Sequence, residues 1–286
     1  MAHNIKDKIR GDWWLWYYYT YLCGAGSAYD ADAEAFFTAS GITDTTTKDA
    51  VNQFVLDTKG GASSTTTNQS DLWTKAVAIW PMVQGNSATP AVAHAQDLKT
   101  TFDLTFINAP TFATTGITFN GTTQYAQTGL NVATSLSTHD VTLCACSNVD
   151  LTGNRTFMGA RDASVNILEI SNIGGTEQLY FRCYDNPNAN AVSVSNGVVV
   201  GTARSSTDFE LYRNGTSIDT GTTSTKTPPS IEMYIACQNN NGTPNFFFDQ
   251  EMRGTAILSG VTDNEAQDLT DAFETLNDAL SRGVIA

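Results

Sequence analysis

Residues 209–219, FELYRNGTSID, contain the clearest signal for the fold of this chain. Asn214 and Gly215 are residue types that accept the two positive φ angles of a type I′ turn, a common short connection between antiparallel strands. Before the turn, Phe209 and Leu211 alternate with Glu210 and Tyr212, which is the period of a strand with one buried side. The segment is therefore predicted to form a tight β-hairpin.

Strand-like sequence patterns extend over most of the chain after residue 100. Further segments there are bounded by Gly, Asn, Asp or Pro and contain the alternation or the β-branched and aromatic residues typical of strands. They are GITFNGTTQYAQT, VTLCACSNVD, RTFMGA, VNILEISN, QLYFRCYD, VSVSNGVVVGTA and IEMYIACQ. Strands at such regular spacing indicate a sandwich or a jelly roll.

The N-terminal third carries helical signals instead. DADAEAFFTASG is predicted to be a helix that ends at Gly41, and TDTTTKDAVNQFVLDTKG one that ends at Gly60. After a loop of small polar residues, SDLWTKAVAIWP is predicted to be a third helix, capped by Ser70 or Asp71 and stopped by Pro81. A small helical module therefore precedes the strands.

The chain closes on another helical pattern. Thr262 and Glu265 have the spacing of a capping box, and apolar residues then recur every three or four positions up to Gly283. A C-terminal amphipathic helix is expected to follow the last strand.

Charge and cysteine content exclude several classes of function. The chain has 286 residues, a formal net charge of −14 and a pI near 4.4. An acidic protein repels phosphate backbones and anionic lipid, so neither nucleic acid nor a membrane is expected as a partner. The cysteines show no paired spacing, which predicts buried free thiols. They are Cys23, Cys144, Cys146, Cys183 and Cys237.

An aromatic run, WWLWYYYTYL at residues 13–22, follows a basic start. Asp12 interrupts the pattern of a secretory signal, and the run is shorter than the about 20 apolar residues of a membrane span. We therefore expect neither a cleaved signal peptide nor a spanning helix. Burial against the chain's own domains and docking to a partner or a second copy both explain so many rings. The residues of this candidate anchor are Trp13, Trp14, Trp16, Tyr17, Tyr18, Tyr19 and Tyr21.

Three segments together resemble the laminin-G/concanavalin A-like sandwich family. GITFNGTTQYAQT is similar to an opening strand with an Asn-Gly turn, FELYRNGTSID to the family's hairpin, and FFFDQEMRGTAILSGVTDNEAQDL to its closing strand and helix. The resemblance implies a mainly β fold: a concanavalin A-like β-sandwich (jelly roll) with a short helical N-terminal module and a C-terminal helix. The resemblance covers about residues 110–280. Together with the aromatic run and the helical pattern, it divides the chain into an anchor at 1–28, a helical module at 29–100 and the sandwich at 101–286.

The helical module resembles one found ahead of such sandwiches in tailed-phage virion proteins. The matching stretches are DADAEAFFTASGITD and LWTKAVAIWP, in which Trp80 stands where that module usually has Tyr and Ser40 precedes Gly41. The resemblance implies a bacteriophage structural protein, such as a head or tail fibre, an appendage or a capsid decoration protein. It would be made in the host cytoplasm, attach to other virion proteins through its N-terminus and form a homo-oligomer, a trimer by analogy.

Catalytic motifs are missing from the sequence. Enzymes on this fold that cleave glycans can use closely spaced strand carboxylates, whereas Glu169, Glu210 and Glu232 stand alone in their strands. The three histidines have no companion motif, and the loop aspartates are too scattered to indicate calcium. The sequence therefore predicts no enzyme, no cofactor and no metal.

Strand alternation suggests a binding face. Tyr180, Arg182 and Tyr184 are predicted on one side of their strand, and Tyr212, Glu232 and Tyr234 on the corresponding sides of two others. Rings stack on sugars and planar polar groups bind hydroxyls, so these six residues are candidates for contact with host surface glycans. Packing of the tyrosines against the helical module or a neighbouring subunit explains the same pattern.

The leading functional hypothesis is a non-enzymatic virion component that displays a lectin-like sandwich. The alternative is a free carbohydrate-binding lectin or a glycan-active enzyme on the same fold.

Overall fold

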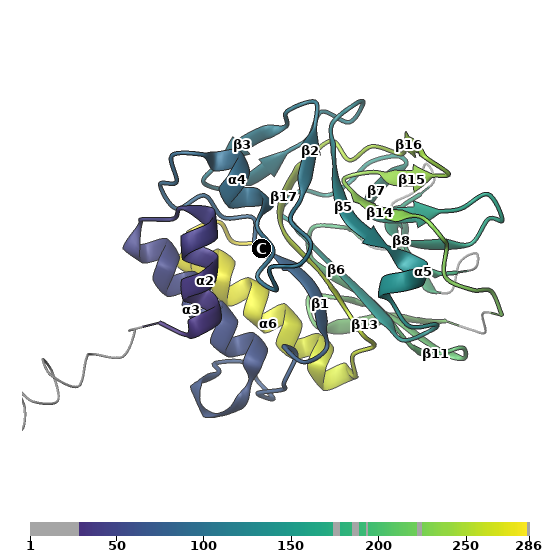
Figure 1. The fold of residues 1–286 in the computed structure, drawn as a ribbon. Coiled ribbons are helices and arrows are strands. Elements are labelled where there is room, and N and C mark those ends of the chain that lie inside the picture. The colour runs from purple at the N-terminus through teal and green to yellow at the C-terminus, as the bar shows by residue number, and fades with distance from the viewer. Residues whose placement is uncertain (1–28, 174–177, 185–188, 193, 222–224, 285–286) are drawn as a thin grey trace, which may run out of the picture.

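The computed structural model describes residues 29–173, 178–184, 189–192, 194–221 and 225–284. Two β-sheets face each other, and helices cover the outer side of one of them (Figure 1). Strand pairings are antiparallel apart from that of β15 with β7. The predicted fold class, mainly β with N-terminal helices and a C-terminal helix, is confirmed.

The first sheet has eight strands in the order β13-β12-β11-β6-β17-β4-β3, with β1 beside β17. Its strands are β1 Ala76–Trp80, β3 Thr111–Ala113, β4 Gly116–Thr118, β6 Val141–Ser147, β11 Gly197–Ser205, β12 Asp208–Arg213, β13 Thr216–Gly221 and β17 Glu251–Leu258.

The second sheet has nine strands and follows the order β10-β9-β8-β7-β14-β5-β2, with β15 and β16 attached at β7. Its strands are β2 Thr105–Ile107, β5 Tyr125–Asn131, β7 Arg155–Arg161, β8 Ile167–Asn172, β9 Gln178–Cys183, β10 Ala189–Val192, β14 Glu232–Ile235, β15 Gln238–Asn240 and β16 Thr243–Asn245.

The hairpin predicted at residues 209–219 is confirmed. Asn214 and Gly215 have φ angles of 50° and 72°, and they connect β12 to β13 with Arg213 opposite Thr216. The Asn-Gly turn of the opening segment is also present, because the Asn120 carboxamide accepts the backbone N–H groups of three following residues. That turn separates β4 from β5, which lie in different sheets.

The main core lies between the two sheets. Its largest member, Trp80, is fully buried, and its indole Nε1 donates to the Phe102 carbonyl at 2.7 Å. Phe157 of β7, Phe181 of β9 and Phe248, from the segment between β16 and β17, belong to the same cluster. Rings and aliphatic chains from both sheets thus exclude water from the centre of the molecule.

Helices form a second core against the eight-stranded sheet. They are α2 Ala31–Ser40, α3 Thr45–Lys59, α4 Pro90–Ala95 and α6 Asp263–Ala279, with a short 3₁₀ turn, η2, at Gly61–Ser63. A further short helix, α5 Val132–Ser135, follows β5 and contributes Val132 to the main core. Phe54 of α3 and Phe273 of α6 have ring centroids 4.9 Å apart, and both belong to a cluster that includes sheet residues such as Val198 and Val200. Figure 1 shows α6 and α3 side by side on this layer.

The predicted helix boundaries are confirmed where a cap defines them. Asp30 and Asp44 cap α2 and α3, and Gly41 closes α2 in the left-handed conformation. Thr262 and Glu265 make the complete capping box of α6, although this helix ends at Ala279, ahead of Gly283.

The third predicted helix, over residues 70–81, is wrong. The Asp71 carboxylate does accept from the Thr74 N–H, but only a turn follows, and β1 then pairs antiparallel with β17. Val77 and Ile79 are β-branched and suit a strand, and the partner strand supplies hydrogen bonds that a local pattern cannot reveal. The sheet thus includes a segment that the sequence pattern assigns to the helical module.

The described cysteines, Cys144, Cys146, Cys183 and Cys237, are buried free thiols, as predicted.

No helix within the described ranges is long and apolar enough to cross a membrane. Residues 1–28, including Cys23 and all seven candidate anchor residues, lie outside the described residues. The division of the chain at residues 28 and 100 stays a prediction.

Candidate functional site

The outer side of the nine-stranded sheet is the sheet surface that the helices leave uncovered. The eight-stranded sheet is covered on both sides, by the main core on one and by the helical layer on the other. On the nine-stranded sheet, β9 and β5 alternate between buried residues that enter the main core and half-exposed residues that face away from it. The half-exposed side chains of β9 and β5 on this outer side are therefore available to a ligand, whereas those of β8 are buried.

A row of five residues crosses the centre of this outer side. Arg182 of β9 lies opposite Glu169 of β8, which lies opposite Gly159 of β7. Gly159 in turn lies opposite Tyr234 of β14, whose other neighbour is Gln127 of β5. Residues directly opposite one another in a sheet project to the same side, so this register brings two charged groups, an amide and a phenol together.

Glu169 organises a polar network in this row. Its side chain is fully buried, and its carboxylate accepts from Arg182 Nη1 at 3.1 Å and from the Ser171 hydroxyl at 3.1 Å. The other carboxylate oxygen accepts from Gln238 Nε2. A Cβ at Gly159 would lie 3.1 Å from Glu169 Cβ, so the missing side chain leaves room for the glutamate. Glu169 is therefore a buried carboxylate paired with Arg182.

Aromatic rings adjoin the network. Tyr125 and Tyr234 have ring centroids 4.9 Å apart, and Phe247 meets Tyr125 edge-on at 6.2 Å. Gln127 Nε2 donates to the Tyr234 hydroxyl at 3.2 Å, and burial raises the pKa of Tyr125. Tyr125 and Phe247 are half-buried and keep part of their rings open. We call Tyr125, Tyr234 and Phe247 the aromatic patch.

Four of the six predicted binding residues lie on this outer side. Arg182 stacks over the Tyr180 ring, with its guanidinium carbon 5.3 Å from the ring centroid, while Tyr234 belongs to the aromatic patch. The Glu232 carboxylate accepts the Gly129 N–H at 2.7 Å at the edge of the same region. Their shared surface agrees with the predicted face, and their role in binding stays a prediction.

The predicted positions of Tyr184 and Tyr212 are wrong. Tyr184 has a φ of 72°, which breaks the strand alternation and turns its side chain into the main core, where its hydroxyl donates to the Ser137 carbonyl at 3.1 Å. Tyr212 lies in the other sheet, and its hydroxyl donates to the Asp263 carboxylate of α6 at 2.7 Å. Alternation along one strand reveals neither a positive φ nor the sheet to which the strand belongs.

Sequence reasoning missed Glu169, Gln127, Tyr125, Gln238 and Phe247. Glu169 stood alone in its strand, and its partners come from β9 and β15 through cross-strand register. The one local signal was a charged residue inside the apolar segment NILEIS, since a buried carboxylate requires partners.

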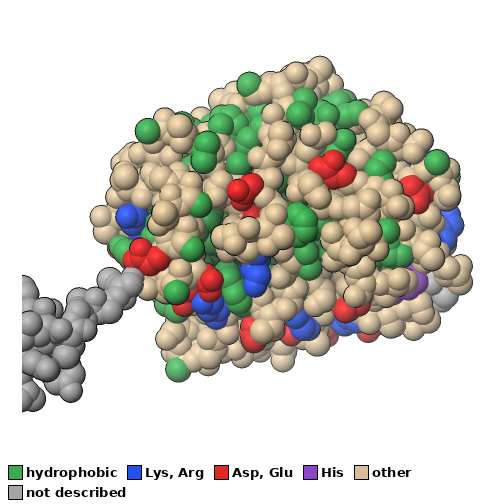
Figure 2. Space-filling model, in the orientation of Figure 1, with side chains coloured by type: hydrophobic (Ala, Val, Ile, Leu, Met, Phe, Trp, Pro, Cys, Tyr) green, Lys and Arg blue, Asp and Glu red, His purple; other side chains and the backbone are tan. Residues whose placement is uncertain are grey.

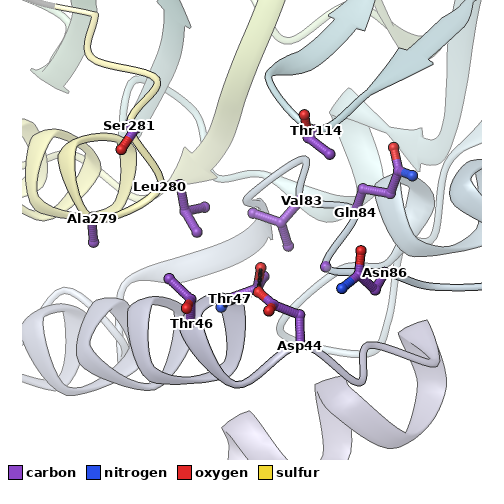
Figure 3. A pocket seen from close by; sticks show the side chains of 11 residues that line it. Asp44, Thr46, Thr47, Val83, Gln84, Asn86, Thr114, Ala279, Leu280 and Ser281 are labelled. Carbon is purple, nitrogen blue, oxygen red and sulfur yellow. Dashed lines mark hydrogen bonds between the residues drawn. The ribbon is translucent and has the colours of Figure 1, made fainter.

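A hollow lies at the helical side of the molecule and has a volume of about 260 Å³ (Figure 3). Its walls come from the start of α3, the segment after β1 and the end of α6. Its single carboxylate, Asp44, accepts from the Thr47 N–H and hydroxyl at 2.8 and 2.7 Å, and this bonding lowers the pKa of Asp44. That carboxylate therefore serves as a helix cap, and the hollow offers no reactive constellation.

Metal ligands do not cluster in the part of the chain that the structure describes: no three His, Cys, Asp or Glu side chains there come together as a metal site. Figure 2 shows acidic and basic side chains interspersed on the middle and lower parts of the visible surface. The candidate site therefore rests on the outer side of the nine-stranded sheet.

Comparison with known proteins supports the fold. No protein family and no curated protein matches the sequence. Trypanosoma rangeli sialidase in complex with difluorosialic acid is similar in structure, with a TM-score of 0.52 and 16% identity over 79% of this chain and 38% of that one. The same sialidase with a difluoro-KDN ligand gives a TM-score of 0.52 and 16% identity over 81% of this chain and 39% of that one.

A weaker likeness is to domain 4 of a Geobacillus stearothermophilus arabinanase in complex with arabinotriose. It has a TM-score of 0.43 and 15% identity over 68% of this chain and 98% of that one, which is too distant to support an inference. The chain spans 38–39% of the sialidase's length, and identity of 16% shows a shared fold alone.

These comparisons correct the prediction that the protein is not an enzyme. That prediction was drawn from the missing carboxylate motif, but the fold is shared with a sialidase, a glycan-acting enzyme. The absence of one motif therefore does not exclude glycan chemistry on this fold.

Proposed function

We propose that this chain is a carbohydrate-recognising β-sandwich that binds saccharides on the outer side of its nine-stranded sheet. The observation that carries the proposal is the aromatic patch next to the Glu169–Arg182–Gln238 network on a single surface. The sandwich fold shared with a glycan-acting protein is consistent with it.

The physical basis is complementarity to a sugar ring. A saccharide presents apolar C–H faces and a rim of hydroxyls, so it needs a flat apolar partner beside oriented hydrogen-bonding groups. Tyr125 and Phe247 offer ring surface, while Gln127 and Arg182 offer planar polar groups in the adjoining row. Most of these groups are already held by neighbours, so little side-chain entropy is lost on binding.

Tyr125→Ala is expected to weaken saccharide binding at least about tenfold, because one well-packed aromatic contact is worth about 1–2 kcal/mol. Tyr125→Phe keeps the ring and should stay within about threefold of the parent affinity. A glycan array followed by calorimetric titration of the best ligand measures both, and release of reducing ends from that ligand reports any hydrolysis.

Trp73→Ala is the matched control for this experiment. Trp73 is a half-buried aromatic that packs against the helical core and lies under Lys99, so its loss should leave saccharide affinity unchanged. Equal binding by the parent and Tyr125→Ala would rule out the patch as the contact surface, and no binding to any glycan would remove the proposal.

Attachment to a virion remains a proposal drawn from the resemblance of the helical module. It assigns residues 1–28 to docking on other virion proteins or on further copies of the chain. Replacing Trp13, Trp14 and Trp16 by Ser should convert an oligomer to a monomer in light scattering, because the rings would form the seam. A monomeric parent chain would count against a self-association seam.

A further inference from the structure

Three buried polar atoms around Glu169 have no hydrogen-bond partner in the described structure. They are Arg182 Nε, Gln238 Oε1 and Thr156 Oγ1. Gln238 is 1% exposed and Thr156 is fully buried. Buried polar atoms are nearly always paired, so several around one carboxylate require partners that the chain does not supply, either ordered water or the hydroxyls of a ligand that displace it.

The three residues lie around Glu169 and Gly159 on the sheet. Arg182 and Gln238 both bind the Glu169 carboxylate, and Thr156 Cγ2 and Glu169 Oε2 lie 2.9 and 3.3 Å from the place where a Cβ of Gly159 would stand. We call this set of Thr156, Arg182 and Gln238 around Glu169 the polar niche. The aromatic patch adjoins it, because Tyr234 is opposite Gly159.

Glu169 determines how the amide of Gln238 is oriented. An ionised carboxylate only accepts hydrogen bonds, so Gln238 must turn its Nε2 toward Glu169 and leave Oε1 for the ligand. The niche then presents one atom that only donates, Arg182 Nε, and one that only accepts, Gln238 Oε1. A hydroxyl group satisfies both kinds, whereas a carboxylate would meet an acceptor with an acceptor.

The charges on this surface also disfavour an anion. Arg182 is paired with Glu169, and Arg155 with Asp249 at 2.7 Å. The remaining charged residues on the strands of this sheet, Arg161 and Glu232, have opposite signs. Beyond the sheet, the whole chain has a net charge of −14, which repels acidic ligands at long range.

We infer that the polar niche selects neutral saccharides, whose hydroxyls bind Arg182, Gln238 and Thr156, and that Glu169 is the positioning residue that excludes acidic sugars. This inference rests on the proposed saccharide binding and names the class of ligand. Glu169 acts through its neighbours, because its own carboxylate oxygens are engaged by Arg182, Ser171 and Gln238.

The test compares neutral sugars with their carboxylated counterparts, for example lactose with sialyllactose and galactotriose with trigalacturonate. The full chain should bind the neutral member of the preferred pair at least about tenfold more tightly. In Glu169→Gln, the new amide can donate to Gln238 Oε1, so Gln238 turns its own Nε2 toward the niche. The positive charge of Arg182 also loses its paired carboxylate. The preference for neutral sugars should fall at least about tenfold.

Glu210→Gln is the matched control, because it makes the same chemical change at a buried glutamate paired with an arginine, Arg204, in the eight-stranded sheet, away from the binding surface. It should leave the preference within about twofold. If it changes the preference as much as Glu169→Gln does, general charge and not the niche is responsible, and the inference is overturned.

The parent chain alone also decides the question, so a variant that fails to fold does not remove the test. Binding of acidic sugars as tight as that of neutral ones would overturn the inference and leave the proposed function standing. Absence of binding to every saccharide would overturn both.

Discussion

Replacing Trp80 by alanine is expected to lower the free energy of unfolding by about 3–5 kcal/mol. Trp80 is fully buried and belongs to the core between the two sheets. Its removal leaves a large cavity and also deprives the Phe102 carbonyl of the indole donor at 2.7 Å. The cost therefore combines lost apolar burial with the loss of a hydrogen bond to a partly buried carbonyl.

Urea unfolding followed by circular dichroism measures this loss. Trp73→Ala is the comparison, because Trp73 is a half-buried tryptophan whose main polar contact is Lys99 Nζ at 4.2 Å from the ring centroid. Its substitution should cost only about 1 kcal/mol. Equal losses for the two variants would show that β1 contributes no more to the core than the segment before it.

Acid is expected to destabilise the protein by about 3 kcal/mol through His94 alone. The ring is fully buried, and Nε2 lies 3.0 Å from the Ala113 carbonyl. Burial and the nearby positive charge of Arg282 lower the pKa of His94 from 6.5 to about 4. The folded state therefore holds this ring neutral, whereas the unfolded chain protonates it.

The lowered pKa of His94 in the folded state determines the direction in which stability changes with pH. Above pH 6.5 the ring is neutral in both states and its contribution is complete; as the pH falls from 6.5 to about 4, the unfolded state gains the proton first and stability declines. His94→Gln can still donate to the Ala113 carbonyl and should flatten this part of the stability profile, measured by urea unfolding across that range.

His139→Gln is the control for the acid profile. Burial also lowers the pKa of His139, but its ring is more exposed than that of His94, so its contribution should be smaller. Asp263 and Asp44 have lowered pKa values and lose their contributions only at more acidic pH, as their unfolded forms protonate near 3.8. An unchanged slope in His94→Gln would show that other groups cause the acid sensitivity.

Much of the fold could be predicted where a short stretch contains its own stabilising contacts. The turn at Asn214 and Gly215 needs only two residues that tolerate positive φ, and the capping box of Thr262 and Glu265 needs only residues three positions apart. The strand at residues 76–80 could not be predicted in this way, because its hydrogen-bond partners lie in β17, far along the chain.

The candidate site depended still more on distant contacts. Tyr180 and Arg182 could be placed together because they share one strand, whereas Tyr184 was misplaced by a single positive φ and Tyr212 by the sheet to which its strand belongs. Glu169 could be identified as a candidate site residue only from its contacts with Arg182 and Gln238, which lie in other strands.

The sequence by itself determined the mainly β character, the hairpin at 209–219 and the helix caps, because propensity and capping act between residues a few positions apart. Only the tertiary structure decided which strands are neighbours, and hence that Glu169, Tyr234 and Gln127 share one row. Cross-strand register depends on packing between distant segments, and a shift of one residue would move every side chain of a strand to the opposite side of the sheet.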